Sequence, residues 1–224
     1  MPRIPIRKFR TIIFDKDGCL YSNHNMHDYW INTVMKSIRR HPMCTTQLHQ
    51  IQQIAEQNIV SQPWEIIINR MAYKWSKTSH ITQANAIDWI TRNVPTDTWK
   101  YQMPLITPYM LDILNSQLIL YTEDYREPTM KQLKRDDIID RFDMILCAGS
   151  MPFLSKNSLI GMSIITSTMN CDPNESCMVG DSDCDIEIGN AAGFYTYAIS
   201  TSGIVHPCAN ETVSCVSDLI YDKN

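Results

Sequence analysis

From about residue 104 onward, short apolar runs alternate with segments whose apolar residues recur every three or four positions. The short runs predict β-strands, and the periodic segments predict α-helices. Strands are expected at residues 11–14, 117–121, 142–147, 176–180 and, as the final one, 195–199; helices are expected at 108–114, 130–135, 158–169 and 186–192. This alternating order predicts an α/β fold with a Rossmann-like parallel sheet and helices on both of its faces.

The segment between residues 22 and 103 has a different pattern, with apolar residues at helical spacing and little that resembles a strand. Helices are expected at residues 26–39, 45–60, 64–75 and 81–92, with Pro42, Pro63 and Pro95 between them. We therefore expect a helical insert at residues 22–103 within a core made of residues 1–21 and 104–224.

Composition narrows the class of protein. The 224 residues are 44% hydrophobic and 20% charged, which is typical of a globular protein. The net charge is −4 and no long basic run occurs, so nucleic acid is not an expected partner. No apolar segment has the length of a signal peptide or a membrane span, so no membrane partner is expected. The eight cysteines include no Cys-x-x-Cys pair, which disfavours zinc and fits reduced thiols in the cytoplasm.

Two carboxylates stand one residue apart at the end of the first predicted strand. Asp15 and Asp17 follow the apolar run at residues 11–14, and Gly18 comes next. Alternate residues of a strand share a face, so both acids can project from the same end of the sheet. Acids this close repel each other unless a cation, a proton or a reaction compensates. The pair therefore suggests a metal-assisted carboxylate nucleophile beside an acid/base group.

Polar and charged side chains also lie next to the ends of other predicted strands and helices. Asp181 and Asp185 follow the strand at 176–180, and their oxygens suit Mg²⁺, although acids at a helix start also favour the helix dipole. Thr122 ends the strand at 117–121 and can hold a phosphate oxygen. Lys156 precedes a predicted helix and either is solvated or faces an anion together with the helix N-terminus. In open α/β sheets, ligands bind at the carboxyl ends of the strands.

Taken in order, these motifs resemble those of the haloacid dehalogenase superfamily, in its phosphatase branch with an α-helical cap. The resemblance covers roughly residues 9–21 and 104–205. The sequences that carry it are Phe14-Asp15-Lys16-Asp17-Gly18, the strand ending at Thr122, Lys156, Gly180-Asp181-Ser182-Asp183-Cys184-Asp185, and the trailing Ala191-Ala192-Gly193-Phe194. The insert at 22–103 is similar to the family's cap, which closes over the site and selects the substrate.

The resemblance implies a role for each site residue. Asp15 would attack phosphorus and form an aspartyl-phosphate, and Asp17 would act as the acid/base. Thr122, Glu123 and Lys156 would form the phosphate site. Metal ligands would come from Asp15, the Asp17 backbone carbonyl, Asp181 and Asp185, the last in the first or second shell of the ion. Phosphoryl transfer depends mainly on positioning and charge neutralisation, which this set supplies.

Three positions depart from the family pattern. Cys19 stands where a threonine is usual, and oxidants should inhibit the protein if its thiol is accessible. Glu123 follows Thr122 where Asn or Ser is common, so a carboxylate would lie near the phosphate. Asn157 replaces the usual proline after Lys156.

The function expected from these observations is Mg²⁺-dependent hydrolysis of a phosphomonoester, with a nucleoside monophosphate, phosphoglycolate or a sugar phosphate as the small soluble substrate. A second acid, Asp17, favours a phosphatase over a dehalogenase, because a dehalogenase has no alkoxide leaving group to protonate. Two alternatives to this function remain: a sugar-phosphate mutase on the same core, and a catalytically silent binding or regulatory protein.

The helical insert offers side chains of two kinds. Its candidate anion contacts, most of which are expected to be solvated, are Arg39, Arg40, Arg70, Lys74, Lys77 and Arg92. Trp64, Trp75 and Trp89 are expected to form the core of the insert rather than a platform for bases. The sequence leaves the oligomeric state open.

Overall fold

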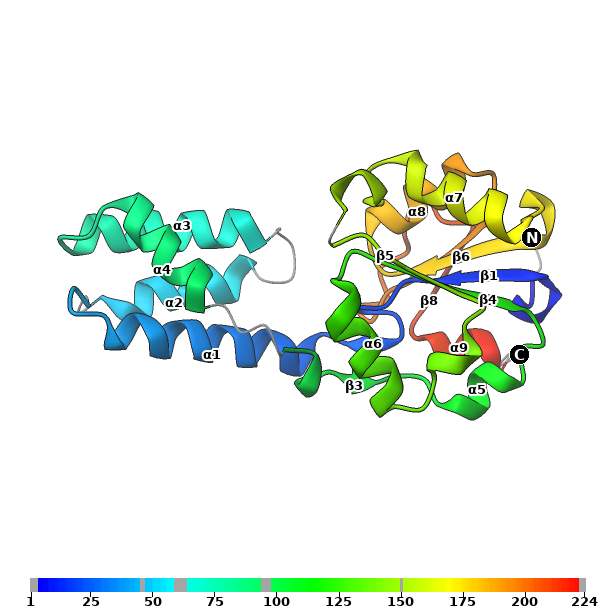
Figure 1. Ribbon diagram of the computed structural model, residues 1–224, viewed down its shortest axis with the longest axis horizontal. Helices are drawn as coiled ribbons and strands as arrows, with labels where there is room; N and C mark the ends of the chain where they lie inside the picture. The colour runs from blue at the N-terminus through cyan, green and yellow to red at the C-terminus, as the bar shows by residue number, and fades with distance from the viewer. Residues whose placement is uncertain (1–3, 45–46, 59–63, 94–97, 150, 222–224) are drawn as a thin grey trace. The chain divides into compact units, whose positions relative to one another are not determined.

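The computed structural model describes residues 4–44, 47–58, 64–93, 98–149 and 151–221. The chain divides into two compact units, one formed by residues 1–23 and 103–224 and the other by residues 24–102. We call them the sheet unit and the helical unit, and each is described by itself (Figure 1). The sequence placed the corresponding boundaries at 21/22 and 103/104. Within the described residues, no helix is both long enough and apolar enough to cross a membrane.

The sheet unit is built on six parallel strands in the order β5-β4-β1-β6-β7-β8. The strands are β1 (Thr11–Phe14), β4 (Gln117–Thr122), β5 (Met144–Cys147), β6 (Ser176–Gly180), β7 (Tyr195–Ile199) and β8 (Glu211–Val213). The helices are α5 (Pro108–Asp112), α6 (Arg126–Arg135), α7 (Leu159–Met169), α8 (Asp183–Ala191) and α9 (Val216–Ile220). A short antiparallel pair, β2 (Tyr21–Ser22) and β3 (Met103–Pro104), lies apart from the sheet.

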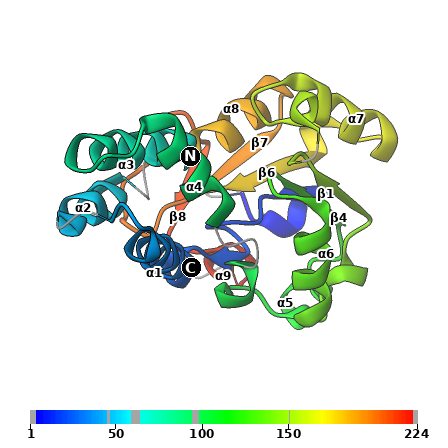
Figure 2. The same ribbon diagram turned by 60° about the vertical axis from the view of Figure 1, so that its left-hand side comes forward.

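Helices cover both faces of the sheet, as Figure 1 and Figure 2 show: α7 and α8 lie on one face, and α5, α6 and α9 on the other. The strands supply alternate side chains to the two faces, since Ile12 and Phe14 belong to one hydrophobic cluster and Ile13 to the other. All three are fully buried. The predicted α/β fold with a Rossmann-like parallel sheet is confirmed.

Some of the predicted strands and helices have other bounds in the structure, and some short elements were not predicted. Strand β8 and helix α9 follow β7, so 195–199 is not the final strand. Helix α6 begins at Arg126 rather than 130, because Pro128 falls in its first turn, where the missing N–H costs nothing. Helix α5 starts at the predicted cap, with the Thr107 side chain accepting from the Met110 N–H, but ends at Asp112 rather than Leu114.

The helical unit contains α1 (His24–Arg40), α2 (Leu48–Asn58), α3 (Trp64–Thr78) and α4 (Gln83–Asn93). Trp75 is fully buried in its core, and its indole N–H donates to the Met43 carbonyl oxygen at 3.1 Å. Trp89 packs against the same core and donates to the Ser37 hydroxyl at 2.8 Å. Both tryptophans therefore form core, as expected. The Trp64 side chain, Pro63, Pro95 and the ends of the predicted helix 45–60 lie outside the described residues.

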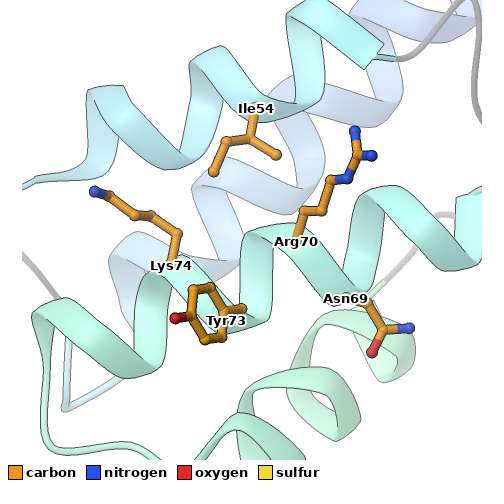
Figure 3. Close-up of a pocket in the computed structure, with 5 residues that line it drawn as sticks. All are labelled: Ile54, Asn69, Arg70, Tyr73 and Lys74. Atoms are coloured by element: carbon orange, nitrogen blue, oxygen red, sulfur yellow. The ribbon is translucent and has the colours of Figure 1, made fainter.

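A cavity of about 550 Å³ opens between α2 and α3 in the helical unit (Figure 3). It is lined by Ile54, Asn69, Arg70, Tyr73 and Lys74. Two of the predicted anion contacts, Arg70 and Lys74, thus share one cavity, and the close-up shows their charged ends directed to opposite sides of Ile54. Arg39, Arg40, Lys77 and Arg92 are exposed, and Arg92 pairs with Asp88 at 2.8 Å.

Cys19 is buried in the hydrophobic cluster that contains Ile12 and Phe14. Its side chain has no exposed surface, and its S–H donates to the Val179 carbonyl oxygen at 3.7 Å. Burial, and then the nearby charge of Asp15, raise the pKa of the Cys19 thiol well above its usual value. The Cys19 thiol is therefore not accessible, which is the condition on which the expected inhibition by oxidants depended.

We expect Ile13→Ala to lower the free energy of unfolding by about 2–5 kcal/mol, because it opens a cavity in the middle of the sheet. Ile160→Ala is the matched control, since Ile160 is 48% exposed on α7 and its truncation leaves no cavity. Urea denaturation followed by circular dichroism measures both, and equal losses would contradict this account of the core.

We also expect Cys19 to resist alkylation in the native protein while the exposed Cys44 and Cys208 react, because a buried thiol with a raised pKa supplies little thiolate. Peptide mapping by mass spectrometry after a timed treatment with iodoacetamide distinguishes the three. Labelling of Cys19 as fast as that of Cys208, with the protein folded, would show that the loop after β1 opens readily.

Candidate active site

Three strand ends meet at one edge of the sheet. Strand β1 lies between β4 and β6, so the residues that follow these parallel strands are neighbours. They include Asp15 after β1, Thr122 at the end of β4 and Asp181 after β6. The backbone continues the sheet pairing beyond the strand, since the Asp15 N–H donates to the Val179 carbonyl oxygen at 2.8 Å. The sheet thereby fixes where the acids stand.

Asp15, Asp181 and Asp185 form an acidic cluster at this edge, with one oxygen atom of each within 4.8 Å of the others. Asp15 and Asp185 are buried, and Asp181 is exposed. The ammonium group of Lys156 enters the cluster and donates to an Asp15 oxygen and, at 2.7 Å, to an Asp185 oxygen. Lys156 is itself buried. A cation that sequence alone allowed to be solvated therefore belongs to the site.

The position of Asp185 follows from the start of helix α8. Ser182 is the N-cap, its hydroxyl accepts from the Asp185 N–H, and the Asp185 side chain accepts from the Ser182 N–H at 3.1 Å. This is a capping box, which satisfies two helix donors at once. The other Asp185 oxygen receives Lys156, so both oxygens have protein partners. A side chain on Gly180 would put its Cβ 2.3 Å from the Asp185 carboxyl carbon, so only glycine leaves room there.

Three carboxylates lie around one ammonium group in this cluster, and two of them, Asp15 and Asp181, have raised pKa values. Burial, together with Asp185, Asp181 and Asp17, raises the pKa of Asp15, and Lys156 only partly offsets this. Desolvation by the surrounding protein and the charge of Asp185 raise the pKa of Asp181 to about 7. Burial alone would lower the pKa of Lys156, but Asp15 and Asp185 outweigh it and raise it, so the lysine stays charged.

The donor set fits a hard divalent cation. Carboxylate oxygens are the ligands that Mg²⁺ prefers, and an added positive charge would offset the repulsion that raises the pKa values. The backbone leaves room for Asp181: Gly18 has a φ of +80°, and a Cβ there would lie 1.9 Å from an Asp181 oxygen. Because Asp185 already has a partner for each oxygen, Asp15 and Asp181 are the ligands best placed for an ion.

Asp17 stands beside this cluster with a separate set of partners. One Asp17 oxygen accepts from the Lys16 ammonium group at 2.7 Å, and 28% of the Asp17 side chain remains exposed. Lys16 also contacts Asp124 at 2.8 Å and Gln132 at 3.0 Å. The two acids of the motif thus have different cations: Lys156 for Asp15 and Lys16 for Asp17. Sequence reasoning missed Lys16, Asp124 and Gln132; the one available signal was a lysine at the end of an apolar run.

Thr122 and Glu123 differ in what they contact. Thr122 is buried, and its hydroxyl oxygen accepts from the Asp124 N–H at 3.2 Å. Glu123 is exposed, and its carboxylate accepts from the Lys156 N–H at 2.5 Å and from the Ser155 hydroxyl at 3.1 Å. Glu123 therefore holds the loop that carries Lys156, which gives its carboxylate a partner other than a phosphate group.

The chain was compared with protein families and with individual known proteins. A family model described as haloacid dehalogenase-like hydrolase matches residues 9–193. No curated protein sequence matches the chain.

Solved structures resemble the chain over nearly its whole length. A haloacid dehalogenase-superfamily hydrolase from Geobacter sulfurreducens is 14% identical, with a TM-score of 0.70 over 97% of each chain. A phosphatase of the superfamily from Thermococcus onnurineus is 15% identical, with a TM-score of 0.60 over 94% of this chain and 95% of its own. The L-2-haloacid dehalogenase from Xanthobacter autotrophicus is 12% identical, with a TM-score of 0.56 over 95% and 97%.

These identities establish a shared fold, and the neighbours include both phosphatases and dehalogenases. The family match spans the strand ends at Asp15, Thr122 and Asp181, and also the loop that carries Lys156. This chain belongs to the haloacid dehalogenase-like hydrolases.

Proposed function

We propose that this hydrolase is a Mg²⁺-dependent phosphomonoesterase that acts on a small phosphorylated metabolite. The observation that carries the proposal is the pairing of a buried acid with a second, partly exposed one. Asp15 is buried against Lys156, while Asp17 keeps 28% of its side chain open beside it. A reaction at carbon–halogen bonds has no leaving oxygen to protonate, whereas phosphoester cleavage needs an acid where Asp17 stands.

The proposed reaction has two steps on the protein's own residues. In the first, an Asp15 oxygen attacks phosphorus, the bond from phosphorus to the ester oxygen breaks, and Asp17 gives its proton to that oxygen. In the second, Asp17 takes a proton from a water molecule as the water attacks the phosphoryl group, which frees Asp15 and inorganic phosphate. Lys156 and Thr122 hold the phosphoryl oxygens, and Glu123 keeps the Lys156 loop in place.

Asp15 and Asp181, with Asp185 beside them, would hold the Mg²⁺ ion. When bound, the ion supplies positive charge that offsets both the carboxylates and the phosphoryl oxygens. Lys156 supplies the rest of this charge from the protein, since its two ion pairs keep it protonated inside the site. The acids and the substrate can then approach each other although both are negative.

We expect Mg²⁺-dependent hydrolysis of p-nitrophenyl phosphate by the purified protein, and its loss in Asp15→Asn, which removes the nucleophile. Asp17→Asn should lose about 10²–10⁴-fold in rate, the usual contribution of a general acid/base. Release of p-nitrophenol at 405 nm measures both. Wild-type turnover no greater than that of a folded Asp15→Asn control would overturn the phosphatase assignment and favour a silent binding protein.

Products from sugar phosphates separate hydrolysis from the mutase alternative. Phosphate released in proportion to substrate consumed supports the hydrolase. Formation of an isomeric sugar phosphate without free phosphate would establish the mutase instead.

We also expect Mg²⁺ to bind more tightly at pH 7.5 than at pH 5.5. The pKa of Asp181 rises from an ordinary value of 3.8 to about 7 in the metal-free fold. Ionisation of Asp181 therefore lowers the stability of the metal-free fold as the pH increases from about 4 to about 7. Mg²⁺ requires the ionised carboxylate, and competition by one proton makes binding on the order of 20-fold weaker at the lower pH. Thermal-shift titrations at the two pH values measure this.

Asp181→Asn is the matched control, because it keeps the side-chain volume and removes the titrating charge. It should weaken the Mg²⁺ response at pH 7.5 and remove most of its dependence on pH. Equal Mg²⁺ affinities for the wild type at the two pH values would contradict competition between a proton and the ion at Asp181.

A further inference from the structure

Lys16 is a charged residue inside the sheet unit that the proposed mechanism does not yet use. It stands between Asp15 and Asp17 in the sequence, and its side chain has no exposed surface. Its ammonium group lies 2.7 Å from an Asp17 oxygen, 2.8 Å from an Asp124 oxygen and 3.0 Å from Oε1 of the Gln132 side-chain amide. An ammonium group has three N–H donors, and three side-chain oxygens face them here.

These partners come from separate parts of the fold. Asp17 belongs to the loop after β1, Asp124 to the loop after β4, and Gln132 to helix α6. Gln132 is fully buried, as Lys16 is, so the surrounding fold encloses both side chains. The Tyr21 ring adds a face 5.6 Å from the ammonium nitrogen. Lys16 is therefore held at a fixed point from which it contacts Asp17.

A buried ammonium group is tolerated only while its partners stay in place, since an unpaired charge in the protein interior is strongly unfavourable. Rotation of the Asp17 carboxylate away from Lys16 would leave that charge with fewer acceptors. The cost resists rotation, so the carboxylate keeps one orientation although part of its side chain is open to solvent.

We propose that Lys16 is a positioning residue that orients Asp17 toward the leaving oxygen of the substrate, an inference that rests on the proposed phosphatase function. Lys16 touches no reacting atom in this role. It acts through Asp17, as Glu123 acts through the loop of Lys156. Misplacing a catalytic group by about 1 Å can cost on the order of 100-fold in rate.

The dependence of the rate on the leaving group tests this role. Phenolate from phenyl phosphate is a poor leaving group and needs the proton from Asp17, whereas 2,4-dinitrophenolate leaves without one. We expect Lys16→Met to lower kcat/KM for phenyl phosphate by about 100-fold, and for 2,4-dinitrophenyl phosphate by less than about 5-fold. A general loss of structure would lower both rates by the same factor.

Three further variants complete the experiment. Asp17→Asn gives the largest leaving-group effect that loss of the acid can produce. Lys131→Met is the matched lysine control, because Lys131 lies on the surface of α6, paired with Glu127 at 2.6 Å, and should change neither rate. If Lys16→Met does not fold, the double variant Lys16→Met/Asp124→Asn removes one positive and one negative charge, so the net charge around Asp17 stays the same.

Equal losses for the two substrates, or no loss for either, in a folded variant would overturn the proposal. A crystal structure of the same variant tests the proposal without any measurement of turnover. An Asp17 carboxylate in the wild-type orientation in that structure would also overturn the proposal. If the wild type hydrolyses neither substrate, the phosphatase function fails, and the crystal structures alone decide whether Lys16 orients Asp17.

Discussion

Repulsion between carboxylates at one edge of the sheet is the constraint on which the rest of this structure depends. One oxygen atom each of Asp15, Asp181 and Asp185 lies within 4.8 Å of the others, and burial makes the charge of Asp15 costly. Lys156 offsets part of that charge from inside the cluster. The remaining negative charge would suit the site to a divalent cation, so the electrostatic excess that opposes folding would also favour the binding of an ion.

The topology of the sheet determines which groups share that charge. In the order β4-β1-β6, the ends of three parallel strands become neighbours, although β1 and β6 lie far apart in the chain. The loops beyond them need few interactions of their own to bring the groups together. Where such interactions occur, they fix individual side chains: Glu123 holds the Lys156 loop, Ser182 holds Asp185, and Lys16 contacts Asp17.

Sequence patterns anticipated the parts of this site that depend on local periodicity. The acids at 15, 17 and 181 follow apolar runs, and the position of a residue after a strand can be read directly from the chain. The partners of Lys16 could not be read in this way, because Asp124 and Gln132 are brought to it by tertiary packing. Strand β8 has only three residues, too few to show an alternation of its own. Glu123 was placed near the phosphate, and its contact with the Lys156 N–H depends on a loop whose path the sequence does not reveal.

The double use of Asp185 bears on how catalysis could be lost during evolution. Its carboxylate caps helix α8 and also contacts Lys156, so one side chain serves both the fold and the chemistry. Selection for a folded protein alone would retain it, together with Gly180 beneath it. Asp17 caps no helix, but it is one of the acceptors of the buried Lys16 ammonium group, so its replacement also has a cost in stability. A descendant that gives up hydrolysis for binding should therefore retain Asp185, and should lose Asp17 together with a change at Lys16.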